Sequence, residues 1–361
     1  MHKMPKWADA FLMPVVNLLL AFFFVSIVII AIGEDPIYAI GRMISRSFGS
    51  TSGWGYTLYY TTSFIFTGLA VAVAFHARMF NIGGEGQAAL GGLGVALVCL
   101  AVDWPHWLIA LPAAAVGGAV FGAAWAFVPA ILQAKRGSHI VITTIMFNFI
   151  AASLLGYLLV NVIKEPGNMA SETRNFPEGA HLPTFHEMLA PLGIEFNQHA
   201  PANISFVLAI LCLIGFWFLM WRTKLGYSLR AFGHSDTGAK YAGISPTKMI
   251  VLSMVISGAM AGLMAVNNVM GESERLIDNF TEGAGFIGIA VALMGRSHPV
   301  GIFFAALLFG FLWQGGNALQ ELHIRRELVT IIQALVILFT GALDNLVRGH
   351  VASYFQDKED A

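Results

Sequence analysis

Charged side chains are scarce in this sequence. Only 11% of the 361 residues are Asp, Glu, Lys or Arg, while 57% are hydrophobic. Soluble domains carry charge on about a quarter of their residues, so this composition excludes an ordinary soluble protein. The formal net charge of -1 also gives no indication of nucleic-acid binding, for which a basic surface is typical. The chain is therefore predicted to be an all-α, polytopic membrane protein.

Cysteines are few, and motifs for binding ATP or a cofactor are missing. Cys99 and Cys212 both lie in apolar runs, which argues against a disulfide framework. The phosphate-binding loop of many ATPases, GxxxxGK[ST], does not occur. GEGQAA at 84–89 and GAGFIG at 283–288 approximate or match a dinucleotide-binding pattern, but neither follows a strand, and helix packing explains them better. We therefore expect this chain to bind no cofactor.

Histidines are present without a recognisable metal or catalytic arrangement. Three of them fall in one loop at irregular spacing and without a ligand cluster, which argues against a metal site: His181, His186 and His199. Four other titratable residues lie near the ends of apolar runs: His76, His139, His298 and Asp344. No HExxH, paired-Asp or Ser/His motif joins them, so the sequence predicts no metal ligands and no catalytic residues.

Long apolar runs occupy most of the chain and predict about ten membrane-spanning helices, each about 20 residues long. The predicted spans lie near residues 12–32, 57–75, 86–102, 107–128, 139–162, 204–220, 249–270, 284–295, 300–319 and 328–346. The first run resembles a signal sequence without a cleavage site, and we interpret it as an uncleaved span. The run at 284–295 is too short to cross a bilayer, which predicts a broken or re-entrant helix. The 38 glycines indicate close helix packing.

Basic residues predict the orientation of these spans. Most of the 20 Lys and Arg residues fall on one side of the membrane in this arrangement, and the positive-inside rule places that side in the cytoplasm. Both termini, including a tail at 349–361, are then cytoplasmic, and residues 1–348 form one transmembrane domain. The loop at 164–202 is expected outside, with a short helix at 184–190, and a polar segment at 222–248 is expected inside.

The polar segment at 222–248 is predicted to be a docking surface, with an ordinary basic loop as the alternative. It holds five basic residues and one acid between two apolar runs. Short helices are expected at 228–232 and 237–242, ended by Gly233 and Gly243, with Ser235 or Asp236 as a cap. The residues expected to carry the docking are Ser228, Arg230, Gly233, Asp236, Lys240 and Gly243.

Polar side chains inside the apolar runs are candidates for lining a path, because such groups are unfavourable in a membrane without partners. Glu85 is predicted to line the path, to cap a helix by accepting backbone N–H bonds, or to pair with Arg78. Asn148 is the first candidate for substrate contact, and the alternative is an interhelical hydrogen bond worth about 0.6 kcal/mol. The path candidates are Asn81, Glu85, Gln87, Thr144, Asn148, Asn267, Asn268, Gln314 and Asn317.

Four segments resemble the permease subunits of ABC importers, in the group that serves branched-chain amino acids, simple sugars and nucleosides. The segment that resembles the family's ATPase-coupling stretch is LGYSLRAFGHSDTGAKYAGIS at 225–245. FNIGGEGQ at 80–87 is similar to the NIGAEGQ signature, with Gly84 where alanine is usual. VITTIMFNFIA at 141–151 resembles EVITTIMLNYIA, preceded by Ser138 and His139 where Asn and Glu are usual. GAGFIGIAVALMGRSHPVG at 283–301 resembles GfegIAVALLGrnnPiG, with Ile287 and Gly288 where Glu and Gly are usual.

The resemblance covers about residues 57–348 and implies a ten-helix permease, not an enzyme, in a bacterial inner membrane. It implies three partners: a second permease, expected to differ from this one, an ABC ATPase subunit that uses the ATP, and an extracytoplasmic substrate-binding protein. The signatures favour nucleosides, with simple sugars as the alternative. The path candidates are rich in amides and hydroxyls, which fits an uncharged substrate of either class. An ion-coupled transporter or channel and a membrane-embedded enzyme are weaker alternatives, since only Glu85 offers an intramembrane carboxylate.

Overall fold

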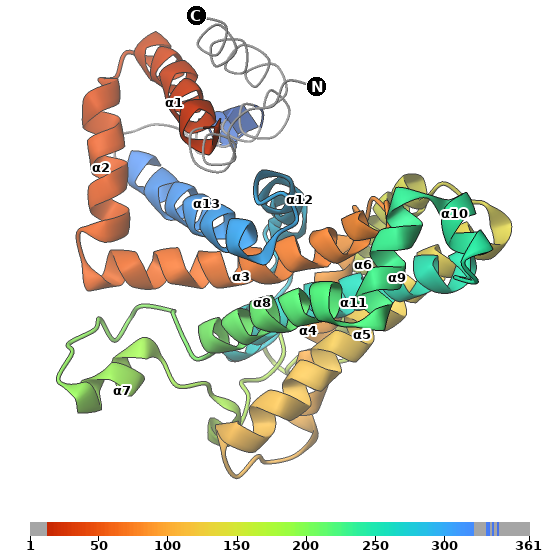
Figure 1. Ribbon diagram of the computed structural model, residues 1–361. Helices are drawn as coiled ribbons and strands as arrows, with labels where there is room; N and C mark the ends of the chain where they lie inside the picture. The colour runs from red at the N-terminus through yellow and green to blue at the C-terminus, as the bar shows by residue number, and fades with distance from the viewer. Residues whose placement is uncertain (1–12, 321–329, 333, 336–337, 339–361) are drawn as a thin grey trace, which may run out of the picture. The chain divides into compact units, whose positions relative to one another are not determined.

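The computed structural model describes residues 13–320, 330–332, 334, 335 and 338, and these residues form helices and loops without a strand (Figure 1). The predicted span at 328–346 falls largely, and the tail at 349–361 wholly, outside the described residues. The helices are α1 (Met13–Ile32), α2 (Pro36–Phe48), α3 (Thr51–His76), α4 (Gly84–Ala101), α5 (Trp107–Arg136), α6 (Ile140–Asn161), α7 (Phe185–Leu189), α8 (Ser205–Arg222), α9 (Lys224–His234), α10 (Asp236–Tyr241), α11 (Pro246–Ala265), η4 (Val266–Met270, a π-helix), α12 (Ala284–Met294) and α13 (Pro299–Gln320).

The all-α, multi-span prediction is confirmed. Within the described residues, seven helices are long and apolar enough to cross a membrane, or eight if the bent pair α1 and α2 counts as one span. Each predicted span up to residue 319 coincides with a helix, and α12, with 11 residues, is too short to span, as expected. The amphipathic helix α2 was not predicted. Asp35 caps it, and it turns 115° from the end of α1.

The chain divides into two compact units, one of residues 1–53 and 311–361 and the other of residues 54–310. In the first unit, the Ser47 hydroxyl donates to the carbonyl oxygen of Phe311 at 3.3 Å, and the rings of Phe48 and Phe311 stack with centroids 5.3 Å apart. These contacts join α2 to the C-terminal part of α13. The second unit contains most of the candidate site residues.

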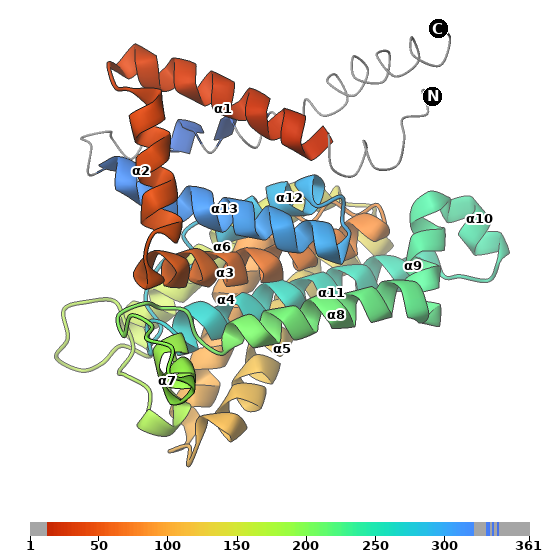
Figure 2. The same cartoon turned by 60° about the vertical axis from the view of Figure 1, so that its left-hand side comes forward.

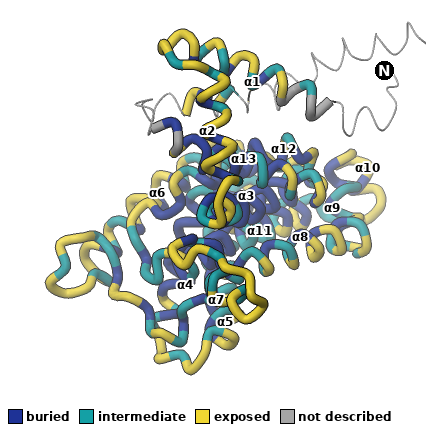
Figure 3. The backbone as a smooth tube through the Cα atoms, turned by 90° about the vertical axis from the view of Figure 1, so that its left-hand side faces the viewer, coloured by how far each residue is buried: buried dark blue, intermediate teal, exposed yellow. Residues whose placement is uncertain are grey.

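In the second unit, α8 and α11 lie side by side and are connected at one end by α9 and α10 (Figures 1 and 2). The helices α3, α4 and α11 are mainly buried, while α5, α6 and α8 expose much more of their surface (Figure 3). Since the exposed side chains on α5, α6 and α8 are largely apolar, we expect lipid or another membrane protein to cover them.

The loop at 164–202 is anchored at several points. The short helix predicted at 184–190 is confirmed as α7, which begins with a capping box formed by Thr184 and Glu187. Arg275 pairs with Glu172, with 3.0 Å between Nε and a carboxylate oxygen, and isolated backbone bridges join 172 to 277 and 184 to 203. The loop is therefore attached through Glu172 to the segment that follows η4, and the bridge from 184 to 203 closes its later part.

Glycines allow α4, α5 and α11 to approach backbone to backbone, which confirms the packing inferred from composition. A Cβ atom on Gly262 of α11 would overlap the carbonyl oxygen of Gly118 on α5, and one on Gly258 would overlap that of Gly122. A Cβ atom on Gly91 of α4 would also overlap the backbone of Gly262. Small residues that let helix backbones touch are a common packing device in membranes.

The variant Gly262→Ala is expected to destabilise the fold by about 1–3 kcal/mol, the usual range for overpacking. The physical reason is that its Cβ meets fixed backbone atoms of α5 rather than a movable side chain. Gly156→Ala is the matched control, because a Cβ there has open space within 4 Å. Thermal unfolding of the purified variants checks this, and equal unfolding temperatures for the two would contradict it.

Candidate functional site

The segment between α8 and α11 forms two consecutive short helices, as predicted, each begun by a hydroxyl cap. The Thr223 hydroxyl oxygen accepts from the backbone N–H of Gly226 at 3.1 Å and begins α9, which therefore starts four residues earlier than expected. The Ser235 hydroxyl accepts from Gly238 N–H at 3.0 Å and begins α10. Gly243 follows α10 in a left-handed conformation with φ +78°, which is typical of a glycine that ends a helix.

The expected role of Gly233 as a helix stop is wrong, because α9 continues to His234. Gly233 is buried, and a Cβ atom there would overlap the carbonyl oxygen of His76 at the end of α3. The glycine therefore lets α9 pack directly on the end of α3. Sequence alone gives no sign of this contact, since His76 lies more than 150 positions earlier in the chain.

An aromatic cluster attaches the base of α9 to three other elements. The His76 ring packs edge-on against Phe216 and Trp221, with centroids 5.8 and 5.5 Å away. Trp221 in turn packs against His298, 5.4 Å away, and the Arg230 guanidinium lies 5.8 Å from the Trp221 ring centroid, as a cation–π contact requires. These ring contacts join α9 to α3, to α8 and to the turn before α13.

The opposite surface of the segment is open and combines aromatic and charged groups. Tyr227 and Tyr241 are 65% and 95% exposed, and Lys240 and Asp236 are also exposed. Exposed tyrosines beside charges are typical of protein interfaces, because their rings bind strongly at little entropic cost. Among the predicted docking residues, Asp236, Lys240 and Gly243 are exposed, Ser228 and Arg230 are half-buried and Gly233 is buried. The tyrosines were not predicted, although aromatic residues in a polar segment are a usable signal.

A first network of buried amides fixes the break between α3 and α4. The Asn81 amide nitrogen donates to Gln87 Oε1 and to Ser257 Oγ, both at 2.8 Å. Its oxygen accepts from Gly83 N–H at 2.9 Å and from the Gln87 amide at 3.1 Å. The Ser257 hydroxyl donates to the carbonyl oxygen of Ala70 at 2.5 Å. The network therefore joins α3, α4 and α11 at a point where the backbone is not helical.

Asn148 binds the same break from α6. Its oxygen accepts from the Gly86 N–H and its nitrogen donates to the carbonyl oxygen of Ile82, both at 2.9 Å. The alternative considered for Asn148, an interhelical hydrogen bond, is thus present in the structure. Thr144, one turn earlier, is buried and donates to the carbonyl oxygen of Ile140 at 2.8 Å.

The variant Asn148→Leu is expected to lower the free energy of unfolding by about 2–4 kcal/mol. Leucine leaves a buried donor and a buried acceptor without partners, each costing about 1–3 kcal/mol. Asn161→Leu on the same helix is the control, because Asn161 is exposed and bonds only its own helix at Tyr157. Thermal unfolding of both purified variants checks the expectation, which fails if Asn148→Leu unfolds at the wild-type temperature.

Glu85, at the start of α4, caps the N-terminus of α12. One carboxylate oxygen accepts from the Thr281 hydroxyl at 2.5 Å and from Gly283 N–H at 2.9 Å, and the other accepts from Gly285 N–H at 2.8 Å. Among the three roles considered for Glu85, capping a helix is the one observed. A carboxylate at a helix N-terminus is stabilised by the exposed N–H groups and by the helix dipole, so Glu85 fixes the broken helix against α4.

A second buried network surrounds the π-helix η4. The Asn267 amide nitrogen donates to the Tyr59 carbonyl and to Ser63 Oγ, both at 2.9 Å, and its oxygen accepts from the Ser205 hydroxyl at 2.7 Å. Asn268 donates to the Tyr59 hydroxyl at 3.0 Å and accepts from the Ser63 hydroxyl at 2.8 Å. π-Helical turns often occur at functional sites, and here the turn directs two adjacent amides towards α3.

The sequence matches one known family over most of its length. Residues 54–341 match the family described as the permease component of branched-chain amino acid transport systems. The chain belongs to this permease family. It is a multi-pass membrane permease of the ABC importer class, as the resemblance of its four segments predicted, and its curated relatives are transporter permeases rather than enzymes.

Three relatives align with nearly all of the permease. The guanosine permease NupP of Bacillus subtilis is 33% identical over 94% of this chain and 95% of the relative. The nucleoside permease NupB of Lactococcus lactis is 32% identical over 91% and 90% of the two chains. The glucose permease TsgB13 of Haloferax volcanii is 32% identical over 94% and 88%. No solved structure matches the permease.

The remaining predicted path residues of the permease lie at the C-terminal end of α13, in the first unit. Gln314 is buried and Asn317 is exposed.

The described residues contain no group of three or more His, Cys, Asp or Glu side chains that could hold a metal ion. In the two networks, sequence reasoning missed five partners, although a polar residue within a turn of another polar residue is a usable signal: Tyr59, Ser63, Asn203, Ser205 and Ser257.

Proposed function

We propose that this permease carries nucleosides across the membrane. The observation that carries the proposal is the similarity to the guanosine and nucleoside permeases, each aligned over more than 90% of this chain. The buried networks support an uncharged substrate, because they consist of amides, hydroxyls and backbone groups, and the carboxylate of Glu85 accepts three hydrogen bonds. Among the described residues, no lysine or arginine takes part in these networks to match a phosphate or carboxylate.

A simple sugar is the second candidate substrate. The glucose permease of Haloferax volcanii is as similar to this chain as the nucleoside permease of Lactococcus lactis, at 32% identity for both. A sugar and the ribose of a nucleoside both offer hydroxyl groups to amide side chains, so the same lining chemistry serves both. The base of a nucleoside distinguishes them experimentally.

The proposed assembly contains this permease, a second and different permease, an ABC ATPase that uses the ATP, and an extracytoplasmic binding protein. Two relatives each from Lactococcus lactis and Bacillus subtilis support the heteromeric pair, since NupC and NupQ match this chain at 26% and 27% identity. The proposed topology has about ten spans, cytoplasmic termini and tail, and an extracytoplasmic loop at 164–202, in a bacterial inner membrane. Residues 1–348 form its transmembrane domain.

Within this assembly, residues 222–248 are proposed to dock on the ATPase, with Ser228, Arg230, Gly233, Asp236, Lys240 and Gly243 carrying the coupling. The exposed tyrosines on α9 and α10 support this role. The nine polar path candidates are proposed to shape the translocation path. Their hydrogen bonds to broken or π-helical backbone support a positioning role, because irregular backbone in a membrane helix needs such partners.

Uptake measurements with four labelled compounds test the substrate class. Cells with and without this chain are given labelled guanosine, adenosine, glucose or ribose, and uptake of each is measured. Loss of nucleoside uptake alone is expected when the chain is absent. Loss of sugar uptake alone would favour the second candidate, and unchanged uptake of all four would contradict both.

A further inference from the structure

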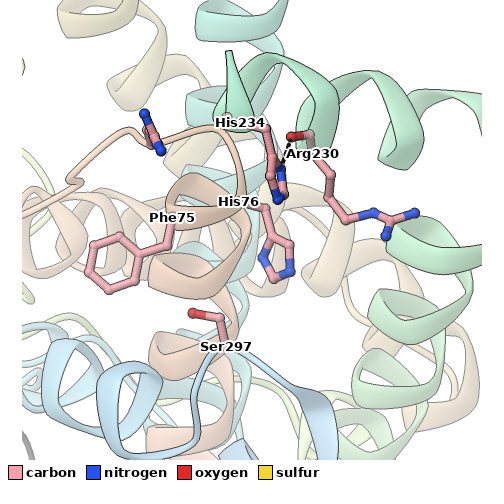
Figure 4. Close-up of a pocket in the computed structure, with 7 residues that line it drawn as sticks. Phe75, His76, Arg230, His234 and Ser297 are labelled. Carbon is pink, nitrogen blue, oxygen red and sulfur yellow. Dashed lines mark hydrogen bonds between the residues drawn. The ribbon is translucent and has the colours of Figure 1, made fainter. Parts of the chain in front are cut away.

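A cationic pocket lies beside the C-terminal half of α9. It measures about 370 Å³ and lies among the end of α3, the turn after α3, α9 and the turn before α13 (Figure 4). Among the residues that the structure describes, its lining includes Arg78, Arg230, His76, His234 and Ser297, and no carboxylate. Among the described residues, neither arginine of the pocket forms an ion pair, and the buried Nε of Arg230 has no acceptor.

Helix ends account for only part of this charge. The C-terminal ends of α3 and α9 lie at His76 and His234, and each helix end carries roughly half a negative charge. The guanidiniums of Arg78 and Arg230 together carry two positive charges, so about one positive charge remains unmatched even with both histidines neutral. A buried N–H donor without an acceptor is unfavourable, and an anionic ligand would supply the missing acceptor. The pocket therefore favours an anion.

An apolar groove lies beside the pocket, between α3, α8 and α11. It measures about 340 Å³, and its lining includes Val73, Leu211, Gly215, Phe216 and Met260. The lining residues of α8 extend from 211 to 219, which corresponds to about 12 Å along a helix. Since α8 exposes most of its apolar surface, we expect the hydrocarbon of the membrane to reach the groove.

The groove and the pocket are neighbours. Phe216 lines the groove, His76 lines the pocket, and their rings pack edge-on with centroids 5.8 Å apart. On α3, Val73 in the groove precedes His76 in the pocket by one helical turn, about 5 Å. On α8, the last groove residue, Leu219, is followed two positions later by Trp221, which packs on His76. An apolar groove thus lies next to a cationic pocket.

We propose that this combined site binds an anionic phospholipid, with the phosphate group in the pocket and an acyl chain in the groove. Basic pockets between transmembrane helices bind lipid head groups through the same chemistry. The groove distinguishes a lipid from a free phosphate, which has no use for apolar surface. Because Arg230 belongs to α9, the bound head group also contacts the segment proposed to dock on the ATPase.

Lipid binding to the purified full-length permease in detergent tests the head-group half of the proposal. Native mass spectrometry compares phosphatidylglycerol with phosphatidylcholine of the same acyl chains, and glycerol phosphate serves as the soluble probe. Wild type is expected to bind phosphatidylglycerol at least tenfold more tightly than phosphatidylcholine. Arg78→Asn is expected to abolish this preference, since asparagine tolerates the left-handed backbone at φ +54°. Arg136→Asn, at the exposed end of α5, is expected to retain it.

A groove variant tests the acyl-chain half. Gly215→Leu places a side chain in the groove where a Cβ meets nothing within 4 Å, and it is expected to weaken binding of both lipids at least tenfold. Gly156→Leu, in open space on α6, is the control and is expected to bind as wild type does. The proposal is overturned if wild type shows no preference for phosphatidylglycerol, if Arg78→Asn keeps the preference, or if glycerol phosphate binds as tightly as the lipid.

Discussion

Replacing Gly233 with alanine is expected to reduce ATP-driven uptake at least tenfold while the permease still inserts into the membrane. The added Cβ would overlap the carbonyl oxygen of His76, so α9 must move away from the end of α3. That movement separates the docking segment from the aromatic cluster of His76, Phe216 and Trp221 that links it to the membrane helices. Under the proposed function, docking on the ATPase continues in this variant, but the movement of the ATPase is no longer transmitted.

Gly238→Ala is the matched control for this prediction. Gly238 lies on α10, and a Cβ there meets only the Ser235 side chain, at 3.1 and 3.4 Å, and no fixed backbone. Uptake of a labelled nucleoside and the amount of permease in isolated membranes are measured for both variants. Uptake by Gly233→Ala within twofold of wild type, at equal membrane content, would show that this contact does not carry coupling.

The variant Glu85→Gln is expected to destabilise the permease by about 2 kcal/mol and to reduce uptake at least tenfold. Hydrogen bonds to a charged group contribute about 1.5–3 kcal/mol each, and Glu85 accepts three, from Thr281, Gly283 and Gly285. A glutamine amide has only one acceptor oxygen, and its NH₂ group would face a backbone N–H. The N-terminus of α12 is then no longer held against α4.

Glu282→Gln is the control for Glu85, because Glu282 lies in the same turn, is exposed and makes none of these contacts. Thermal unfolding measures the loss of stability, and uptake measures the functional effect. If the two variants unfold at the same temperature and transport equally well, the carboxylate of Glu85 does not hold the broken helix.

Much of the local structure was predictable from neighbouring residues. The apolar runs located every described span, and most of the predicted boundaries fall within a few residues of the observed helix ends. The short helix α7 and the start of α10 followed from Thr184 and Ser235, whose hydroxyls cap the turn directly after them. Gly243 indicated the end of α10 because its left-handed backbone depends on the residue itself.

The long-range partners of the site were not predictable in the same way. Asn81, Glu85, Asn148 and Asn267 stood out because amides and carboxylates are rare in apolar runs. Their partners lie elsewhere in the fold, such as the turn before α12 that Glu85 caps from about 200 positions away. The period of an apolar run indicates which face of a helix is buried, but it does not determine which distant backbone groups need a partner.

The role of Gly233 shows the same limit. A glycine after a short helical pattern favours a helix end, and Gly243 follows that rule. Gly233 instead permits a close approach between α9 and α3, which depends on where α3 ends in space. The helix α2 was missed for a different reason, since it has only 13 residues and carries Arg42 and Arg46 among its apolar side chains. A search for long uncharged runs therefore passes over it.

The central claim, that this chain is the permease of an ATP-driven nucleoside importer, is tested most directly by nucleoside uptake under ATP depletion. Labelled guanosine is given to cells that contain or lack the chain, with cellular ATP either normal or depleted. Uptake is expected to require both the chain and ATP. Uptake that is unchanged without the chain, or that continues through the chain after ATP depletion, would contradict the claim.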